Sequence, residues 1–452
     1  MKYYSTNGKA PVADLNKAVV KGLAEDRGLY MPERINKLPK VFFDDIQDIK
    51  FQDIAYNVAS AFFGEDVDLD ALKDLVYDTL QFDCPVVKVK DNIYSLELFH
   101  GPTLAFKDVG ARFMARLLQY FLRHGSAGCN DIATNAKNET VNVLVATSGD
   151  TGSAVANGFL GVDGIHVYVL YPKGKVSPIQ ECQFTTLGKN ITAIEVDGVF
   201  DDCQALVKSA FMDQELNQHM KLTSANSINV ARFLPQAFYY FNAYARIKAL
   251  GEADNLVMCV PSGNFGNICS ALFGHAMGLP VKRFIAANNA NDIFYKYLQT
   301  GKYEPKASVQ TLANAMDVGD PSNFARIINL YSENNQLTPE ATHHRITNLI
   351  SGATYSDEQI KETMRQCYQE TGYILDPHGA CGYQALVDNL QPGEVGVFCE
   401  TAHPAKFKEK VDDILGIDVE IPARLRAFME GQKQSVAMTK DFNDFKQYLL
   451  KQ

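Results

Sequence analysis

Residues 141 to 161 read VNVLVATSGDTGSAVANGFLG, and this stretch decides the fold class. Its first six residues are apolar apart from one asparagine, the next six are polar or glycine, and the rest has the composition of a helix. A short continuous apolar run, bounded by a loop, is typical of a strand that is buried on both faces. The stretch therefore predicts a strand, a loop and a helix of an α/β protein.

The same order of elements recurs along the chain. Apolar runs followed by polar loops or helix-like segments occur at residues 166–171, 191–196, 255–260, 281–287 and 395–400. Such strands, alternating with helices, favour parallel sheets that helices cover on both faces. Ligands of these sheets bind beyond the carboxyl ends of the strands. The sequence therefore predicts doubly wound α/β sheets with several polar loops gathered at one edge.

The chain of 452 residues is long enough for more than one domain. Single hydrophobic cores stop growing at roughly 250 to 300 residues. We expect an N-terminal segment at 1–98 that joins the larger domain, a smaller α/β domain at 99–225, and a large α/β domain at 226–452. Residues 300–390 predict a helical elaboration of the large domain, and the polar residues 126–140 predict a surface insertion.

Charge and cysteine content disfavour several classes of function. The net charge is −10 and the 43 basic residues are dispersed, which argues against nucleic acid and anionic membranes as partners. No leader-like segment and no run of roughly 18 apolar residues is found, so we expect no membrane span. The nine cysteines contain no CxxC pair, which favours a reducing cytoplasm over a disulfide framework or a zinc site. Adjacent histidines, His343 and His344, would diverge on a helix and are poor metal ligands.

Two glycine-containing loops are candidates for anion binding. PSGNFGN, residues 261–267, follows an apolar strand and opens an apolar helix, an arrangement that can direct backbone N–H groups at a phosphate. It matches neither GxGxxG nor GxxxxGK[ST], and an ordinary turn remains an alternative. TSGDTG, residues 147–152, offers hydroxyls and N–H groups for a carboxylate, although capping of the next helix would explain Asp150 or Thr151 equally well.

Lys107 lies within HGPTLAFKDVGARFMARLL, residues 100–118, where an amphipathic helical pattern begins. Burial and the positive end of a helix dipole both disfavour an ammonium, which would make this amine a better nucleophile than a surface lysine. Such an amine can form a Schiff base with a carbonyl cofactor. The alternative is a lysine whose charged end reaches water beside Asp108.

Two further segments bring polar residues to the expected edge. ANSINVARFLPQ, residues 225–236, places Asn229 and Arg232 on one helix face if the segment is helical, which suits a phosphate or an interdomain ion pair. ETAHPAKF, residues 400–407, follows the last strong strand and contains the hydroxyl of Thr401.

Five of these motifs together, in this order and at these separations, resemble the threonine synthase family: HGPTLAFKD, TSGDTG, NSIN, SGNFGN and ETAHPAKF. The segment GLAEDRGLYMP, residues 22–32, also resembles the opening of that family. The resemblance covers nearly the whole chain and is weakest at 126–140 and after about residue 410. It implies an enzyme of fold type II, similar to the tryptophan synthase β subunit, that depends on pyridoxal 5'-phosphate.

The resemblance also implies roles for residues in the motifs. Lys107 is expected to form the Schiff base with the cofactor, and Thr401 to lie near the pyridine nitrogen. The expected cofactor-phosphate loop consists of Ser262, Gly263, Asn264, Phe265, Gly266 and Asn267. The substrate carboxylate is expected at Thr147, Ser148, Gly149, Asp150 and Thr151. Asn229 and Arg232 are the candidates for the substrate phosphate.

The implied reaction converts O-phospho-L-homoserine and water to L-threonine and phosphate, the last step of threonine biosynthesis. It combines γ-elimination of phosphate with β-addition of water, and Lys107 is the expected proton carrier. The only implied partner is this small substrate, no metal is expected, and the assembly state, monomer or homodimer, stays open.

Three alternatives remain at this point. A relative with the same cofactor could release ammonia and a 2-oxo acid by elimination, although SGDTG differs from the SSGNTG-like loop expected of serine and threonine dehydratases. The chain could also be a non-catalytic protein that binds a phosphorylated ligand, or an inactive subunit. Retention of Lys107 argues against both, because binding alone needs no Schiff base.

Overall fold

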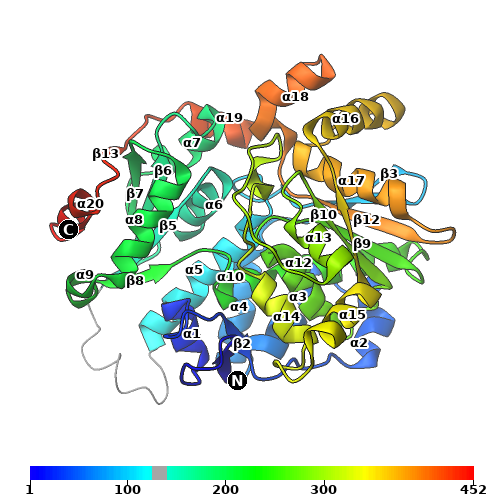
Figure 1. The fold of residues 1–452 in the computed structure, drawn as a ribbon, viewed down its shortest axis with the longest axis horizontal. Coiled ribbons are helices and arrows are strands. Elements are labelled where there is room, and N and C mark those ends of the chain that lie inside the picture. Colours follow the sequence, from blue (N-terminus) through cyan, green and yellow to red (C-terminus); the bar gives the residue numbers. More distant parts are fainter. Residues whose placement is uncertain (125–139) are drawn as a thin grey trace.

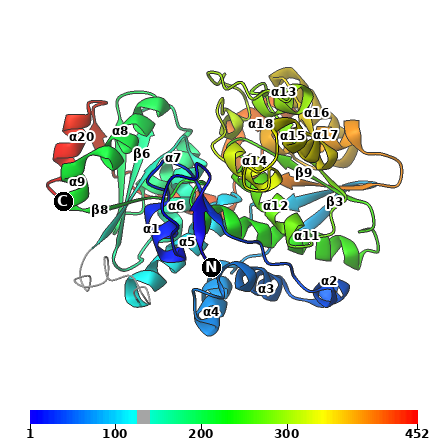
Figure 2. The same cartoon turned by 60° about the horizontal axis from the view of Figure 1, so that its bottom comes forward.

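The computed structural model describes residues 1–124 and 140–452, and it confirms the predicted α/β class. Two mainly parallel sheets lie side by side, each with helices packed against it (Figure 1; Figure 2). The predicted surface insertion at 126–140 falls, apart from Thr140, outside the described residues. Within the described ranges, no helix combines the length and the apolar character needed to cross a membrane.

A five-stranded parallel sheet forms one half of the molecule. Its strands, in spatial order, are β13 (Val436–Met438), β7 (Ile191–Val196), β6 (Ile165–Pro172), β5 (Val141–Ala146) and β8 (Lys221–Ser224). The connecting helices are α6 (Asp150–Phe159), α7 (Pro178–Thr185), α8 (Phe200–Met212) and α9 (Gln214–His219). Every residue of β5 is buried, as its continuous apolar sequence predicts.

A six-stranded sheet forms the other half. Its order is β11 (Ile350–Thr354), β10 (Arg283–Asn288), β9 (Leu256–Pro261), β12 (Val395–Glu400), β4 (Ile93–Glu97) and β3 (Val86–Lys90). All neighbours are parallel except β3, which runs antiparallel to β4. Its main helices are α11 (Ala237–Ala249), α12 (Gly266–Ala276), α13 (Ile293–Thr300), α14 (Phe324–Tyr331), α15 (Pro339–Leu349), α16 (Asp357–Thr371) and α17 (Pro377–Asn389).

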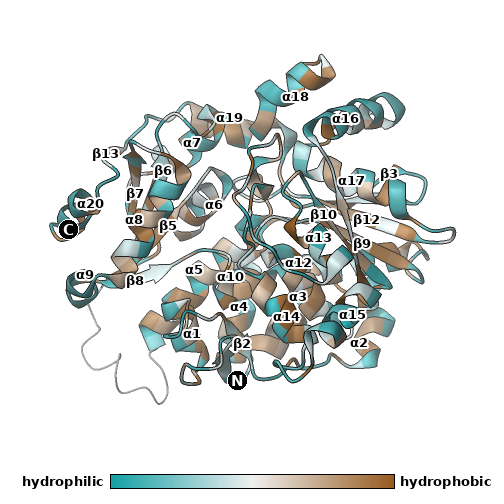
Figure 3. Ribbon diagram, viewed as in Figure 1, coloured by the Kyte–Doolittle hydropathy of each residue, from teal (hydrophilic) through white to brown (hydrophobic). Residues whose placement is uncertain are grey.

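The remaining elements cover the sheets and their junction. The N-terminal part contains the antiparallel pair β1 (Tyr3–Ser5) and β2 (Tyr30–Pro32), with helices α1 (Leu15–Lys21), α2 (Lys40–Asp45), α3 (Phe51–Phe63) and α4 (Leu69–Thr79). Short 3-10 turns are η1 (Ile46–Asp48), η2 (Leu234–Gln236), η3 (Asn314–Met316) and η4 (Pro404–Phe407). Near the C-terminus lie α18 (Lys408–Leu415), α19 (Ala423–Met429) and α20 (Phe442–Leu449). In Figure 3 the inner helix α12 is mainly hydrophobic, whereas the outer helix α16 is mainly hydrophilic.

All six strands that the sequence predicts are present, as β5, β6, β7, β9, β10 and β12. The shorter strands β3, β4, β8, β11 and β13 were not predicted, because five residues or fewer carry too little apolar pattern. The region 300–390 is largely helical, as expected, but it also supplies β11 to the edge of the larger sheet.

The N-terminal strands β3 and β4 and the C-terminal strand β13 belong to different sheets, which the predicted domain boundaries describe only in part. Strands β3 and β4 join the larger sheet, in line with the expected placement of residues 1–98. Residues 226–452 were all assigned to the large domain, yet β13 pairs with β7 of the smaller sheet. Phe445 and Leu449 of α20 are buried in the core beneath that sheet. The last residues therefore belong with the smaller sheet, a long-range pairing that no local pattern indicates.

Candidate functional site

Lys107 is the first residue of α5 (Lys107–His124), where the sequence predicted a helix to begin. The preceding residues run beside the segment that follows β12: the Phe106 N–H donates to the Thr401 carbonyl at 2.8 Å, and His403 N–H donates to the Leu104 carbonyl at 3.0 Å. This pairing holds Thr401 next to Lys107, although 294 positions separate them in the numbering. The Lys107 amine donates to Thr151 Oγ1 at 2.8 Å, which connects the start of α5 with the start of α6.

Surrounding protein makes the Lys107 amine unusually easy to deprotonate. Removal from water lowers the pKa of Lys107 from 10.5 to about 8, and the positive charges of Arg232 and Lys406 act in the same direction. The negative charge of Asp150 opposes this shift without cancelling it. A substantial fraction of the amine is thus neutral near physiological pH, as a nucleophile or a base requires.

The loop at residues 147–152 folds around the hydroxyl of Thr147. Its Oγ1 accepts hydrogen bonds from the N–H groups of Gly149 and Gly152, at 2.9 and 2.8 Å. Gly149 has a φ of 147°, and a Cβ there would stand 2.7 Å from the amide of Gln180, so only glycine fits. The backbone N–H groups of Ser148, Asp150 and Thr151 donate to no residue in the described part of the chain. They lie at the start of α6, where an anion is favoured.

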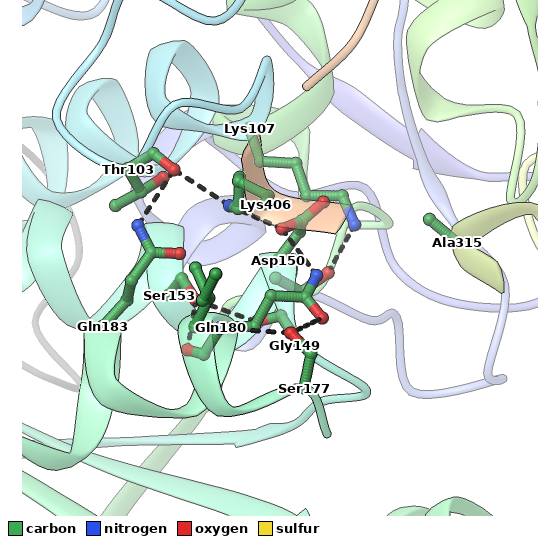
Figure 4. A network of polar contacts seen from close by, with 12 residues as sticks. Thr103, Lys107, Gly149, Asp150, Ser153, Ser177, Gln180, Gln183, Ala315 and Lys406 are labelled. Atoms are coloured by element: carbon green, nitrogen blue, oxygen red, sulfur yellow. Dashed lines mark hydrogen bonds and ion pairs between the residues drawn. The ribbon is translucent and has the colours of Figure 1, made fainter. Parts of the chain in front are cut away.

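Asp150 takes part in a buried ion pair. Its Oδ1 lies 2.6 Å from the Lys406 ammonium and accepts from Gln180 Nε2 at 3.0 Å (Figure 4). The same ammonium donates to the Thr103 carbonyl at 2.9 Å. Burial alone would raise the pKa of Asp150, but the nearby Lys406 and Lys107 outweigh it and lower that pKa to about 2. Asp150 is therefore ionised.

The loop between β9 and α12 is shaped for a phosphate. Phe265 has a left-handed φ of 65°, and the backbone N–H groups of Gly263 to Asn267 make no hydrogen bond to any described residue. Side chains fix the loop from behind: Ser262 Oγ donates to the Val260 carbonyl, and Asn267 Nδ2 donates to the Pro261 carbonyl. Unbonded N–H groups at the start of an 11-residue helix are the feature that a phosphate site requires, and the binding itself stays a prediction.

The irregular segment around η3 closes over this loop. Asn264 Oδ1 accepts from the Ser322 N–H at 2.7 Å, and its Nδ2 donates to Ser227 Oγ at 3.1 Å. A Cβ on Gly263 would stand 2.6 Å from the Ala315 carbonyl oxygen. Figure 4 shows Ala315 on the side of the network where the Lys107 amine lies. That the loop at 262–267 and Lys107 form one site stays a prediction.

The two residues expected at the substrate phosphate differ from each other. Asn229 is fully buried and caps α10 (Val230–Phe233): its Oδ1 accepts from Ala231 N–H, and its Nδ2 donates to the carbonyls of Val19 and Ser224. Both amide hydrogens of Asn229 are engaged within the protein, so no free donor supports its expected role at the substrate phosphate, and that role stays a prediction. The contact between Asn229 and the Val19 carbonyl, 210 positions away, cannot be read from local sequence.

Arg232 keeps an unused donor. It is 1% exposed, one terminal nitrogen donates to the Ala225 carbonyl, and its Nε has no partner among the described residues. Burial lowers the pKa of Arg232 to about 10, with Asp108 opposing the shift. Arg232 influences the charge state of Lys107, so it lies close enough to remain a candidate at the site.

Sequence reasoning missed Lys406 and a group of three buried polar residues near the site. Lys406 stands in the quoted motif ETAHPAKF, so its presence between apolar neighbours was the available signal. The group of three is Glu400, Asp376 and His378, which are all buried. Asp376 N–H donates to Glu400 Oε1 at 2.6 Å, and His378 Nε2 accepts from the Ala315 N–H at 3.1 Å. The group therefore supports η3 from behind the phosphate-shaped loop.

No cluster of three potential metal ligands occurs among residues 1–124 and 140–452. His343 has a structural role, since its Nε2 lies within hydrogen-bonding distance of the carbonyls of Tyr297 and Leu298. The eight cysteines in these ranges are all free thiols.

Comparison with known families and structures gives one consistent result. Residues 80–398 match the family model described as pyridoxal-phosphate dependent enzyme, residues 2–80 match threonine synthase N terminus, and residues 379–449 match threonine synthase, C-terminal. The threonine synthase of Serratia marcescens is 44% identical over 451 residues, covering 100% of this chain and 99% of that protein.

Solved structures agree over the same length. The crystal structure of threonine synthase from Escherichia coli has a TM-score of 0.89 at 40% identity and is covered completely. A structure of threonine synthase from Brucella melitensis, whose title states that pyridoxal phosphate is bound, has a TM-score of 0.92 at 32% identity, covering 100% of this chain and 99% of that one. On these grounds the chain belongs to the threonine synthase family of pyridoxal-phosphate-dependent enzymes.

Proposed function

We propose that this chain converts O-phospho-L-homoserine and water to L-threonine and inorganic phosphate. The observation that carries the proposal is the buried Lys107 amine, whose pKa is lowered to about 8 and which donates to Thr151 at the start of α6. The starts of α6 and α12 both present unbonded N–H groups that suit anions. One suits a cofactor phosphate and the other suits a substrate carboxylate. The relatives' activity supports the assignment of the reaction to this geometry.

The residues present fit pyridoxal phosphate. The unbonded N–H groups of Gly263 to Asn267 would hold its phosphate, Lys107 would bond to its aldehyde carbon, and the Thr401 hydroxyl would face its ring nitrogen. When bound, the cofactor supplies an electrophilic carbon for amines and a ring that accepts the electron pair left by a departing proton. A hydroxyl such as that of Thr401 can exchange a hydrogen bond with the ring nitrogen but brings no charge to it.

Lys107 is the group that can move protons at the reacting carbons. The neutral form of the Lys107 amine, which its lowered pKa favours, would be the base that removes the proton from Cα of the bound substrate. Removal of a second proton, at Cβ, lets the phosphate leave Cγ, and water then adds at Cβ. Lys107 can return protons at Cγ and Cα, because Thr151 Oγ1 at 2.8 Å holds its amine in place between transfers.

The start of α6 would orient the substrate for these steps. The free N–H groups of Ser148, Asp150 and Thr151 can receive the substrate carboxylate, which fixes Cα relative to Lys107. Gly149 has the left-handed φ of 147° and the close contact with Gln180 that keep the loop in this conformation. We also propose a cytoplasmic location, which the free cysteines of the described chain support, because unpaired thiols are typical of reducing compartments.

A product assay tests the proposed reaction. The purified protein, loaded with pyridoxal phosphate, is incubated with O-phospho-L-homoserine, and phosphate, threonine and 2-oxobutyrate are quantified together. Equal amounts of threonine and phosphate are expected. A predominance of 2-oxobutyrate would replace the proposal with an elimination reaction, and absence of all products from folded, loaded protein would favour a binding role.

The lowered pKa of Lys107 predicts the pH dependence of its reaction with aldehydes. Because its pKa is about 8 rather than 10.5, the amine is mostly protonated below pH 8 and mostly neutral above it. Covalent attachment of pyridoxal phosphate to the cofactor-free protein, trapped with borohydride and mapped by mass spectrometry, should rise with pH and level off above about pH 8. A rise that continues toward pH 10.5, as for an exposed lysine, would contradict this environment.

Arg232 is expected to contribute to binding of the substrate phosphate. Arg232→Lys keeps a positive charge but loses the planar guanidinium, so one charge-assisted hydrogen bond of roughly 1.5 to 3 kcal/mol disappears and KM should rise at least about tenfold. Steady-state kinetics with O-phospho-L-homoserine measures this, and a cofactor titration checks that pyridoxal phosphate still binds. Unchanged KM would leave Arg232 a purely structural residue.

A further inference from the structure

Lys406 occupies the point at which three segments of the chain meet. Its ammonium bonds to Asp150 of α6 and to the carbonyl of Thr103, which lies between β4 and α5 (Figure 4). Lys406 itself belongs to η4, which follows β12 of the larger sheet. The Thr103 carbonyl also accepts from Gln183 of α7 at 3.0 Å. The Lys406 side chain is 0% exposed, so this contact ties the two sheets together beneath the site.

The ion pair is not explained by stability. Removing two charges from water costs several kcal/mol per ion, which the attraction between them offsets only in part, and an apolar pair of similar volume often stabilises a fold as well or better. Burial of Asp150 also brings a negative charge into the loop that presents the free N–H groups of Ser148 and Thr151. An uncompensated carboxylate there would repel the carboxylate of an amino-acid substrate.

Lys406 removes this conflict. Its ammonium lies on the Oδ1 side of Asp150, together with Gln180 Nε2, so the charge is neutralised from behind while the backbone of the loop stays available. Gln180 Oε1 accepts from Ser177 Oγ at 3.1 Å, and Gln180 also packs against Gly149. The orientation of the Asp150 carboxylate is therefore coupled to the course of the loop itself.

We infer that Lys406 is a positioning residue for the reaction: by neutralising and holding Asp150, it lets the loop at 147–152 accept the anionic substrate beside Lys107. This inference rests on the proposed function for the identity of the substrate. It assigns to the lysine of ETAHPAKF a role in binding the substrate carboxylate that is distinct from proton transfer by Lys107.

The test compares Lys406→Met, which removes the charge at similar length, with the double variant Lys406→Met, Asp150→Asn, which removes both charges. Lys406→Met should raise KM for O-phospho-L-homoserine about tenfold or more, because a negative charge now faces the substrate carboxylate at short range. The double variant should recover most of that loss, since the amide of asparagine is neutral. Lys408→Met is the matched control, because Lys408 bonds to Asp412 and Asp418 on α18 and its neighbourhood, and should leave KM unchanged.

A second readout does not depend on turnover. In cofactor-free protein, the pH profile for acetylation of Lys107, followed by peptide mass spectrometry, should move upward by about one pH unit in Lys406→Met, because one positive neighbour is lost while the negative charge of Asp150 remains. In the double variant the profile should return toward that of the unaltered protein. The charged groups that determine this profile are Asp150, Arg232 and Lys406.

The outcomes separate the inference from the proposed function. An unaltered KM in Lys406→Met, or a double variant as impaired in KM as the single one, would overturn the role of Lys406 while the reaction stands. If Lys406→Met fails to fold, as judged by circular dichroism, the double variant decides alone: near-normal KM supports charge neutralisation and a strongly raised KM refutes it. If the unaltered protein forms no threonine, the proposed function fails, and the Lys107 acetylation profile still tests the ion pair.

Discussion

Lys107→Ala should reduce threonine formation by roughly 10³- to 10⁴-fold, the loss associated with removal of a positioned acid–base group. The variant loses the amine that bonds to the cofactor and the group that carries protons at Cα and Cγ. The variant should fold normally. Burial disfavours the charged amine, and its removal takes only one hydrogen-bond donor away from Thr151 Oγ1. Product formation is measured by mass spectrometry, and folding by circular dichroism and thermal unfolding.

Added amines provide an internal check on this result. If Lys107 acts as a base, small primary amines such as ethylamine should restore part of the activity of Lys107→Ala, more strongly at higher pH where they are neutral. Lys408→Ala serves as the control for loss of a lysine outside the site. Near-normal product formation by Lys107→Ala would falsify the role proposed for Lys107.

Gly263→Ala should weaken binding of pyridoxal phosphate by about 100-fold, the effect expected when reacting or binding groups move by about 1 Å. The new Cβ would stand 2.6 Å from the Ala315 carbonyl oxygen and 3.1 Å from Met316 Cα. Both are backbone atoms of η3, which His378 holds through the Ala315 N–H, so the loop rather than η3 must move. Cofactor affinity is measured by absorbance titration of cofactor-free protein.

The matched control is Gly393→Ala, at a glycine whose added Cβ meets nothing within 4 Å. That change should lower stability slightly, because its φ of 81° disfavours a side chain, but should leave cofactor affinity intact. Unchanged affinity in Gly263→Ala would show that the loop tolerates displacement. It would then remove Gly263 from the residues that shape the phosphate site.

Much of the fold can be predicted from local sequence, because its signals are local. The six predicted strands are mainly apolar, and most of their residues are buried, as that pattern implies. Lys107 begins α5 where the amphipathic pattern begins, and residues 261–267 form a strand-to-helix loop as their glycines and asparagines suggest. Edge strands such as β13 lack this signal, because three residues are too few to show a period.

The candidate site is likewise predictable from local sequence only in part. The residue types that a phosphate loop, a carboxylate loop and a nucleophilic amine require are visible as motifs, and the family resemblance orders them. Their partners are not visible. Asn229 donates to the Val19 carbonyl while capping α10, and Lys406 pairs with Asp150 across the junction of the two sheets. Both contacts join residues far apart in the chain.

The sequence by itself determined the α/β class, the strand-to-loop-to-helix units and the identity of the amine, because hydrophobic periodicity and loop composition act over a few residues. Only the tertiary structure decided that β13 and α20 join the smaller sheet. It also decided that the Asn229 side chain caps α10 and that Asp150 forms an ion pair with Lys406. Burial and charge pairing are sums over neighbours brought together by the whole fold, and so they give Lys107 a lowered pKa that no stretch of sequence specifies.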